Sequence, residues 1–255
     1  MADSCRASFG DMAKDFDRLF EDVVGLTRRE ALSLDAVLKP KGVRTVLDCA
    51  CGTGIQSIGL AQLGYQVSAS DISPVMLRLL RDKASSLRLT IETKRSDFRS
   101  LRAWNGGHFD AVVSCGNSLS LVPSLDDVSR ALASMLRVTK SPGGLGVIGV
   151  HNYPKLKREG EVLSFRRASN SDAGPEWVFD VRLFGRERVK VTHVFLHLVG
   201  RRWKLKTYTK SYLNLSPADL QATLLRVGYR SGRLLDIKGQ RESSDGEWVL
   251  AVGEA

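Results

Sequence analysis

Residues 45–54 read TVLDCACGTG, a short apolar run that ends in a glycine-rich turn. A run of this length bounded by glycines predicts a buried strand, and we expect a helix after it over 55–63, ending at Gly64. Glycines in such a turn let a ligand approach the backbone where a side chain would collide with it. The stretch therefore predicts a strand, a turn and a helix that together bind a ligand.

The alternation of strand and helix continues on both sides of this unit. On the N-terminal side, apolar residues at helical spacing predict two helices between Phe9 and Leu38. Further strands are expected over 66–71, 89–93, 109–115 and 145–151, and further helices over 74–85 and 125–138. Strands that alternate with helices at these intervals indicate the α/β fold class, a parallel sheet with helices on both faces.

The pattern changes after about residue 161. Alternating polar and apolar residues predict antiparallel strands that cover or line a substrate pocket, over 161–167, 177–183, 190–198 and 203–213. A helix capped by Ser216 and strands ending near Val252 follow.

We therefore expect a Rossmann-like, mostly parallel seven-stranded sheet with added segments. The expected divisions are an N-terminal helical cap over 1–44, a cofactor-binding core over 45–152, an inserted antiparallel β subdomain over 153–213, and a C-terminal helix and strands over 214–255 that complete the core sheet.

The composition limits the class of protein. Hydrophobic residues make up 43% of the chain and charged residues 26%, which excludes a disordered or fibrous chain. No apolar stretch reaches the ~18 residues that span a bilayer, and the first residues do not form a signal peptide, so we expect a cytoplasmic protein without a membrane partner. The net charge of +10 is scattered, which favours a solvated basic surface over a nucleic-acid partner without excluding one.

The cysteines suit packing better than metal binding. Cys49, Cys51 and Cys115 fall in strand-like apolar runs, and no second Cys/His pair completes a four-ligand set. We therefore expect neither a metal site nor a disulfide framework.

A carboxylate follows the second expected strand. Asp71 lies 23 residues after Asp48, at a strand end where a carboxylate can accept hydrogen bonds from both hydroxyls of a ribose. The alternative is a charge that only stabilises the start of the next helix.

Four motifs in this order resemble class I methyltransferases that use S-adenosylmethionine. They are VLDCACGTG at 46–54, ASDIS at 69–73 with Met76-Leu77 behind it, SDF at 96–98 and FDAVVSCGNSL at 109–119. A dinucleotide dehydrogenase more often shows G-x-G-x-x-G, whose third glycine this chain lacks. The resemblance implies S-adenosylmethionine as the cofactor and S-adenosylhomocysteine as the product.

The resemblance also implies which residues bind this cofactor. The backbone of the glycine-rich turn would face its methionine part, and Asp71 its ribose. Asp97 would accept a hydrogen bond from the adenine amine, and Ile72 and Phe98 would pack beside the ring, unless both are plain core residues. The residues implied for the cofactor site are Asp48, Ala50, Gly52, Gly54, Asp71, Ile72, Met76, Asp97, Phe98 and Cys115.

Within this class, three further segments resemble the glycine N-methyltransferase group, which includes the sarcosine and dimethylglycine methylating enzymes. The first is an aromatic N-terminal helix with Phe16 and Phe20 that runs into Thr27-Arg28-Arg29. It resembles the segment whose arginine holds the cofactor's carboxylate by bidentate pairing. Arg28 is the first candidate and Arg29 the alternative, with a surface salt bridge as the other interpretation of either. Phe20 would border the substrate.

The other two segments follow the fourth and fifth expected strands. Residues 115–119 resemble a loop whose asparagine, here Asn117, contacts the substrate, with a simple turn residue as the alternative. Residues 151–153 resemble the triplet R-N-Y, with His151 in place of the arginine that grips the carboxylate of glycine, and with Tyr153 retained. The carboxylate of a glycine acceptor would therefore lack the arginine that is expected to bind it. The interpretation as a methyltransferase is unaffected, because other residues hold the cofactor.

The chemistry implied is an in-line transfer of an activated methyl group to a small amine or amino-acid-like acceptor. The amine must be unprotonated, so we expect His151 either to act as a base with a pKa near neutrality or only to form a hydrogen bond. Asn117 and Tyr153 complete the expected catalytic set. Tyr153, Tyr208 and Tyr212 would aim hydroxyl groups into the substrate pocket, unless they simply pack.

Other interpretations stay open. The basic charge suggests RNA methylation, but residues 115–118 read Cys-Gly-Asn-Ser instead of the N/D-P-P-Y/F typical of base-methylating enzymes. The core motifs allow O- or C-methylation of a natural product. The intact glycines and acidic residues disfavour a non-catalytic cofactor-binding subunit. The sequence allows a monomer or a homodimer.

Overall fold

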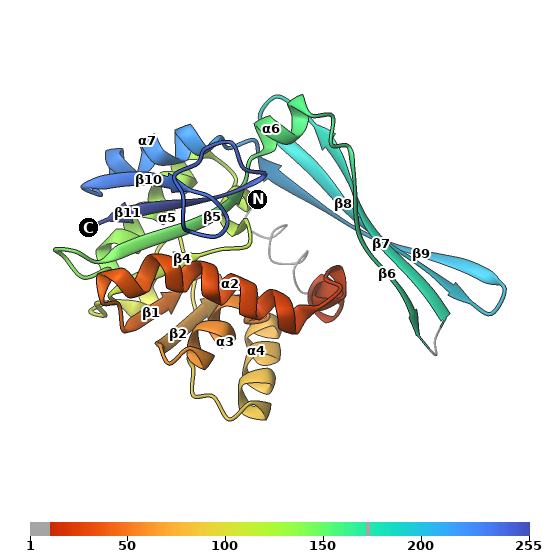
Figure 1. Cartoon of the computed structure of the whole chain (residues 1–255), viewed down its shortest axis with the longest axis horizontal. Coiled ribbons are helices and arrows are strands. Elements are labelled where there is room, and N and C mark those ends of the chain that lie inside the picture. Colours follow the sequence, from red (N-terminus) through yellow and green to blue (C-terminus); the bar gives the residue numbers. More distant parts are fainter. Residues whose placement is uncertain (1–10, 172–173) are drawn as a thin grey trace.

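The protein is built around two separate β-sheets (Figure 1). The computed structural model describes residues 11–171 and 174–255. The larger sheet has seven strands in the order β10-β11-β5-β4-β1-β2-β3, and the smaller sheet has four in the order β6-β7-β8-β9. This arrangement confirms the expected Rossmann-like α/β fold with an additional antiparallel sheet.

Five strands of the larger sheet run parallel to one another. They are β1 (Thr45–Asp48), β2 (Gln66–Asp71), β3 (Glu92–Arg95), β4 (Ala111–Ser114) and β5 (Leu145–His151). β11 (Trp248–Glu254) pairs antiparallel with β5, and β10 (Ser231–Leu235) pairs antiparallel with β11. The strand order reverses at β1, and ligands of open α/β sheets bind beyond the carboxyl ends of the strands at such a point.

Helices cover both faces of this sheet (Figure 1). α2 (Val23–Leu38) and α3 (Ile55–Gln62) pack on one face, and α5 (Leu125–Val138) and α7 (Pro217–Val227) on the other. The remaining helical segments are η1 (Ala13–Leu19), η2 (Lys39–Lys41), α4 (Pro74–Ser86), η3 (Arg102–Trp104), η4 (Ser118–Leu121) and α6 (Tyr153–Arg158). Within the described residues, every helix is too short or too polar to cross a membrane.

The structure departs from the expected elements at two places. β3 begins at Glu92 instead of residue 89, because Leu89 N–H still bonds to the Ala84 carbonyl and so belongs to the end of α4. The sequence analysis also missed α6. Asn152 caps this helix by accepting the Lys155 backbone N–H, and Pro154 occupies its first turn, but six residues are too few to show helical periodicity.

The inner face of the smaller sheet buries charged as well as apolar side chains. Its strands are β6 (Leu163–Ser171), β7 (Gly174–Phe184), β8 (Arg188–Val199) and β9 (Arg202–Leu213), all antiparallel. Along β7, Glu176, Asp180 and Arg182 are buried, whereas the alternate positions Trp177 and Leu183 are exposed. Because side chains of a strand alternate between faces, one face of this sheet carries buried charges and the other exposed apolar groups.

The N-terminal segment η1 connects the two sheets. Asp17 accepts a hydrogen bond from Thr53 Oγ1 in the glycine-rich turn at 2.7 Å, and its other oxygen pairs with Lys83 of α4 at 2.5 Å. Asp15 accepts from the Tyr208 hydroxyl of β9 at 2.6 Å, and Arg18 pairs with Glu176 of β7. These contacts hold η1 across the space between the glycine-rich turn and the smaller sheet.

Candidate active site

A cavity of about 410 Å³ opens beyond the carboxyl ends of the parallel strands. Its volume lies within the range of about 300–1,000 Å³ usual for small-molecule sites. The residues that line it come from η1, the glycine-rich turn, the loops after β2, β3, β4 and β5, and the inner face of the smaller sheet. Elements far apart in the sequence therefore form one site.

Two positions of the turn, 52 and 54, require glycine for different structural reasons. Gly52 has a φ of +52° and lines the cavity, and a Cβ there would meet no protein atom within 4 Å. Gly54 has a φ of +96°, but a Cβ there would lie 2.9 Å from Leu80 Cγ of α4. Gly52 thus leaves room for a ligand, whereas Gly54, which is outside the cavity lining, allows α3 and α4 to pack closely.

Asp71 lies at the end of β2 in the cavity wall. Its carboxylate accepts the Gly52 backbone N–H at 3.0 Å and the Ser73 backbone N–H at 2.8 Å, which fixes its orientation. Burial raises the pKa of Asp71, while these backbone contacts lower it by a smaller amount. A carboxylate has further lone pairs beyond these two bonds, so it can also accept from ribose hydroxyls.

Asp48 lies beneath the turn instead of in the cavity wall. It is 1% exposed and accepts a hydrogen bond from Ser57 Oγ at 2.6 Å. Burial raises its pKa to about 6. The expected contact of Asp48 with the cofactor is therefore replaced by a bond that joins β1 to the first turn of α3.

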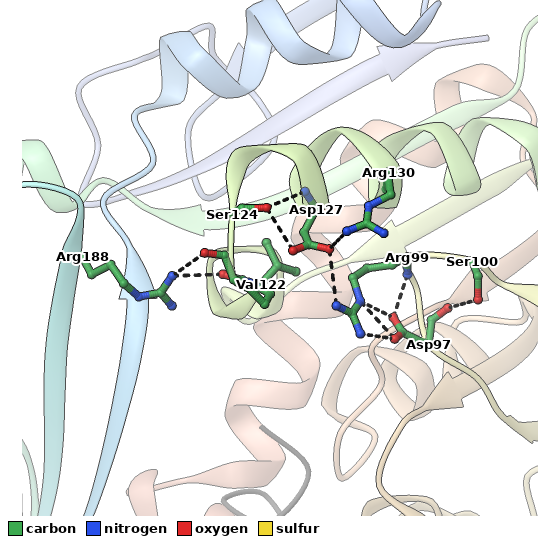
Figure 2. A network of polar contacts seen from close by, with 9 residues as sticks. Asp97, Arg99, Ser100, Val122, Ser124, Asp127, Arg130 and Arg188 are labelled. Carbon is green, nitrogen blue, oxygen red and sulfur yellow. Dashed lines mark hydrogen bonds and ion pairs between the residues drawn. The ribbon is translucent and has the colours of Figure 1, made fainter. Parts of the chain in front are cut away.

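Asp97 and its neighbours form the adenine side of the expected site. Asp97, Phe98, Ile72 and Met76 all line the cavity, as the sequence predicts. Figure 2 shows that Arg99 holds the Asp97 carboxylate with Nε 3.0 Å from both oxygens and Nη2 2.6 Å from Oδ2. Arg99 also reaches Asp127 in the first turn of α5 at 3.4 Å, so this network fastens the loop after β3 to α5.

Helix α2 turns a different side chain to the cavity than expected. Arg28 and Arg29 are exposed and do not line it, whereas Leu26 and Glu30 do. Leu26 and Glu30 are four residues apart and so share one face of the helix, which points Arg28 elsewhere. Glu30 accepts a hydrogen bond from Gln56 Nε2 at 3.3 Å, and burial raises its pKa.

The loops after β4 and β5 bring the expected catalytic residues together. Asn117 has a φ of +66° and precedes η4; its Nδ2 donates to the Tyr153 hydroxyl at 2.9 Å, and its Oδ1 accepts the His151 backbone N–H at 3.1 Å. Asn117 is 3% exposed and Tyr153 2%. Burial raises the pKa of Tyr153 well above its usual value, so its hydroxyl stays protonated at neutral pH.

His151 does not have the pKa near neutrality that the sequence analysis allows for. Its ring packs on Trp248 with centroids 3.7 Å apart. Burial, together with the charges of Arg166 and Arg182, lowers the pKa of His151 to about 3. The ring is therefore neutral at physiological pH, and its Nδ1 has no hydrogen-bond partner among the residues that the structure describes.

The smaller sheet contributes four polar residues that sequence reasoning missed: Arg166, Asp180, Arg182 and His193. Asp180 and Arg182 alternate with apolar residues along β7, a pattern that normally marks a solvent-facing side of a sheet. Of the aromatic residues predicted to border the substrate, Phe20, Tyr153 and Tyr212 line the cavity. Tyr208 does not, because its hydroxyl is held by Asp15 of η1.

Comparisons with known proteins agree with this geometry. A family described as "Methyltransferase domain" matches residues 46–144. A glycine/sarcosine N-methyltransferase from Parasynechococcus marenigrum is 34% identical over 217 residues, covering 83% of this chain and 68% of that protein. Another, from Aphanothece halophytica, is 34% identical over 146 residues, covering 56% of this chain and 55% of that protein.

Among solved structures, the CcbJ methyltransferase from Streptomyces caelestis has a TM-score of 0.79 at 20% identity, covering 97% of this chain and 98% of that one, which shows a shared fold. The chain belongs to the family of S-adenosylmethionine-dependent methyltransferases that includes the glycine/sarcosine N-methyltransferases. Its cofactor is accordingly S-adenosylmethionine. The open space beside Gly52 and the oriented carboxylate of Asp71 fit that cofactor.

Proposed function

We propose that this protein transfers a methyl group from S-adenosylmethionine to the nitrogen of a small, amino-acid-like amine. One observation carries the proposal. Asn117 donates to the Tyr153 hydroxyl and accepts the His151 backbone N–H at the ends of β4 and β5, in the same cavity as Gly52 and Asp71. The names of the relatives, glycine/sarcosine N-methyltransferases, support an amino-acid acceptor.

The cofactor would occupy the side of the cavity next to β1 and β2. The backbone at Ala50 and Gly52 would face its methionine part, and Asp71 its ribose. Glu30 offers a half-buried carboxylate that would bind the cofactor's ammonium group. The exposed Arg28 would make no contact with the cofactor's carboxylate. When bound, the cofactor supplies a methyl group that its sulfonium already activates.

The adenine would lie on the other side of the same region. Ile72, Met76 and Phe98 would pack against the ring, and Asp97, held in place by Arg99, would accept from the adenine amine. The backbone near Cys115 would border the same ligand, since Cys115 and Gly116 also line the cavity.

The protein's own residues would position the acceptor more than deprotonate it. A neutral His151 with an unpaired Nδ1 can accept a hydrogen bond from the amine, and the Tyr153 hydroxyl and Asn117 amide can hold it in line. Burial lowers the pKa of an amine, as do nearby positive charges. Arg182 supplies such a charge at this site. The acceptor would therefore bind as the free amine, with Phe20 and Tyr212 at its border.

The cavity supports a small molecule over RNA as the acceptor, since residues from η1 and from the smaller sheet line it together with the glycine-rich turn. We further propose a cytoplasmic protein, as a monomer or homodimer. The cysteines of the described residues, Cys49, Cys51 and Cys115, are all unbridged, which suits a reducing compartment.

The test has two stages. Titration calorimetry first measures S-adenosylhomocysteine binding, and a methyl-transfer screen then compares amino acids, simple amines, hydroxylated and carbon-acid natural products, and RNA. We expect binding of the product and methylation of a small amine. Transfer only to RNA or only to oxygen or carbon acceptors would replace the N-methylation proposal, and binding without any transfer would favour a non-catalytic role.

A further inference from the structure

One buried cation in the cavity wall, Arg182, has only a long ion pair to balance it among the residues that the structure describes. The Arg182 side chain on β7 is 3% exposed and lines the cavity. Among residues 11–171 and 174–255, its guanidinium donates one hydrogen bond, from Nη1 to the Glu161 carbonyl oxygen at 3.0 Å. The Glu161 carboxylate lies 3.9 Å away and is 49% exposed. A guanidinium has five N–H donors, so most of those of Arg182 are left for a ligand.

The neighbouring charges, by contrast, are matched. Arg166 donates to Asp180 Oδ2 from Nε at 2.8 Å and from Nη2 at 2.5 Å, and His193 Nδ1 lies 2.7 Å from Asp180 Oδ1. Burial raises the pKa of Asp180, but the contacts with His193 and Arg166 outweigh it and lower the pKa to about 2. The Asp180 carboxylate is therefore ionised, and its two oxygens are engaged by Arg166 and His193.

Arg182 also lies near the residues expected to hold the acceptor. It shares the cavity wall with His151 and Tyr153, and its positive charge lowers the pKa of both side chains, against the larger effect of burial on Tyr153. Position 151 itself offers no charge, because the imidazole is neutral. An anionic group of the acceptor would thus find its cationic partner on the smaller sheet and not at the end of β5.

We propose that the guanidinium of Arg182 binds the negatively charged group of the methyl acceptor, which makes the acceptor an anionic amine. This inference rests on the proposed N-methylation. Burying a cation is costly when it has no partner, and an anion at Arg182 would remove that cost while fixing the distance from the anion to the reacting nitrogen. Carboxylate and phosphate both suit the planar donor fork of a guanidinium, and a carboxylate matches the amino-acid-like acceptor.

The first experiment varies the anion of the acceptor. Methyl transfer by the wild-type protein is measured with amino acids, with their amides and with the amines that lack the carboxyl group. Ethanolamine and its phosphate ester form a second pair. We expect kcat/KM to be at least about 30-fold higher for the anionic member of one pair, since a buried charge pair is worth 2 kcal/mol or more. Equal rates for anionic and neutral members would overturn the proposal.

The second experiment removes the cation. Arg182→Gln should raise KM for the anionic acceptor by about 30-fold or more, should leave KM for the neutral analogue nearly unchanged, and should leave the affinity for S-adenosylhomocysteine within about twofold. Arg182→Lys, which keeps the charge without the fork, should recover part of the loss. Arg186→Gln is the matched control, because Arg186 follows the same strand and is exposed.

Thermal unfolding separates a binding role from a structural one. An unbalanced buried cation destabilises the free protein, so Arg182→Gln should unfold at the same or a higher temperature than the wild type. Acetate or inorganic phosphate, compared with chloride at equal ionic strength, should raise the unfolding temperature of the wild type loaded with S-adenosylhomocysteine but not that of Arg182→Gln.

Stabilisation by acetate or phosphate is measured without turnover. It therefore distinguishes failure of the proposed function from failure of the proposed anion site. Anion stabilisation that requires Arg182, without any amine methylation, would reject the proposed function and keep the anion site. Amine methylation with a KM that Arg182→Gln does not change, or a variant that is both less stable and slower with every acceptor, would reject Arg182 as the anion-binding residue.

Discussion

The two sides of the cavity differ in charge. The side next to β1 and β2 presents backbone groups, the carboxylates of Asp71 and Glu30, and the Asp97–Arg99 ion pair. The opposite side presents Arg182, the Asp180–Arg166 ion pair and the neutral ring of His151. A cofactor that carries a sulfonium and an ammonium suits the acidic side, and an anionic acceptor suits the basic side. In the proposed function, the larger sheet therefore binds the cofactor and the smaller sheet selects the acceptor.

The largest expected effect is the loss of cofactor affinity when Asp71 on the acidic side is substituted. Asp71→Asn should weaken S-adenosylhomocysteine binding by roughly 100-fold, because two hydrogen bonds from ribose hydroxyls to a charged acceptor are lost or weakened. Titration calorimetry measures it, with the exposed Asp126→Asn as the control. Because the amide oxygen can still accept one backbone N–H, the variant should fold. An unchanged affinity would remove Asp71 from the cofactor site.

A second expected effect concerns stability on the basic side. The pKa of His151 is lowered to about 3 in the folded state, so below its unfolded value near 6.5 the unfolded chain binds the additional proton and stability falls as pH falls. This one group should cost about 2 kcal/mol between pH 7 and pH 5. Urea unfolding of the wild type and of His151→Asn at both pH values tests this prediction. Between pH 7 and pH 5, the unfolding free energy of the variant should fall by about 2 kcal/mol less than that of the wild type. Equal losses would show that His151 titrates normally.

A smaller effect tests which side chain of α2 contacts the cofactor. Glu30→Gln should weaken S-adenosylhomocysteine binding about tenfold by removing the negative charge that faces the ammonium group. Arg28→Gln should change the affinity less than twofold, since Arg28 is exposed and outside the cavity. The same calorimetric titration compares the two. The reverse order of effects would restore Arg28 as the residue that holds the cofactor's carboxylate.

The smallest expected effect compares two tyrosines. Tyr153→Phe removes the hydroxyl that accepts from Asn117 and should lower kcat/KM about tenfold, a loss of one hydrogen bond with a buried partner left unpaired. Tyr208→Phe should stay within about twofold, because its hydroxyl points to Asp15 and not to the cavity. Steady-state kinetics with the acceptor found in the screen decides between them.

The residues that the sequence located well share one property. Gly52, Phe98 and Asn117 follow strands of the parallel sheet and Asp71 ends one, and all four line the cavity. Parallel strands bring their carboxyl ends to one edge, so a residue's place in the chain is enough to predict its place in the site. The same rule located Tyr153 after β5.

The residues that the sequence did not locate depend on orientation or on long-range packing. Glu30 instead of Arg28 faces the cavity because of the rotation of α2 about its axis, which neighbouring side chains set. Asp180 and Arg182 occupy alternate positions of a strand, and the pattern alone does not tell a solvent-facing side from a polar side buried by η1 and the core. Tyr208 could not be placed without the contact to Asp15.

The most direct test of the division between the two sides is S-adenosylhomocysteine titration of the wild type, Asp71→Asn and Arg182→Gln under one set of conditions. We predict tight binding by the wild type and by Arg182→Gln, and binding about 100-fold weaker by Asp71→Asn. Equal loss of affinity in both variants would contradict a separate acceptor side, and no binding by the wild type would contradict the cofactor site itself.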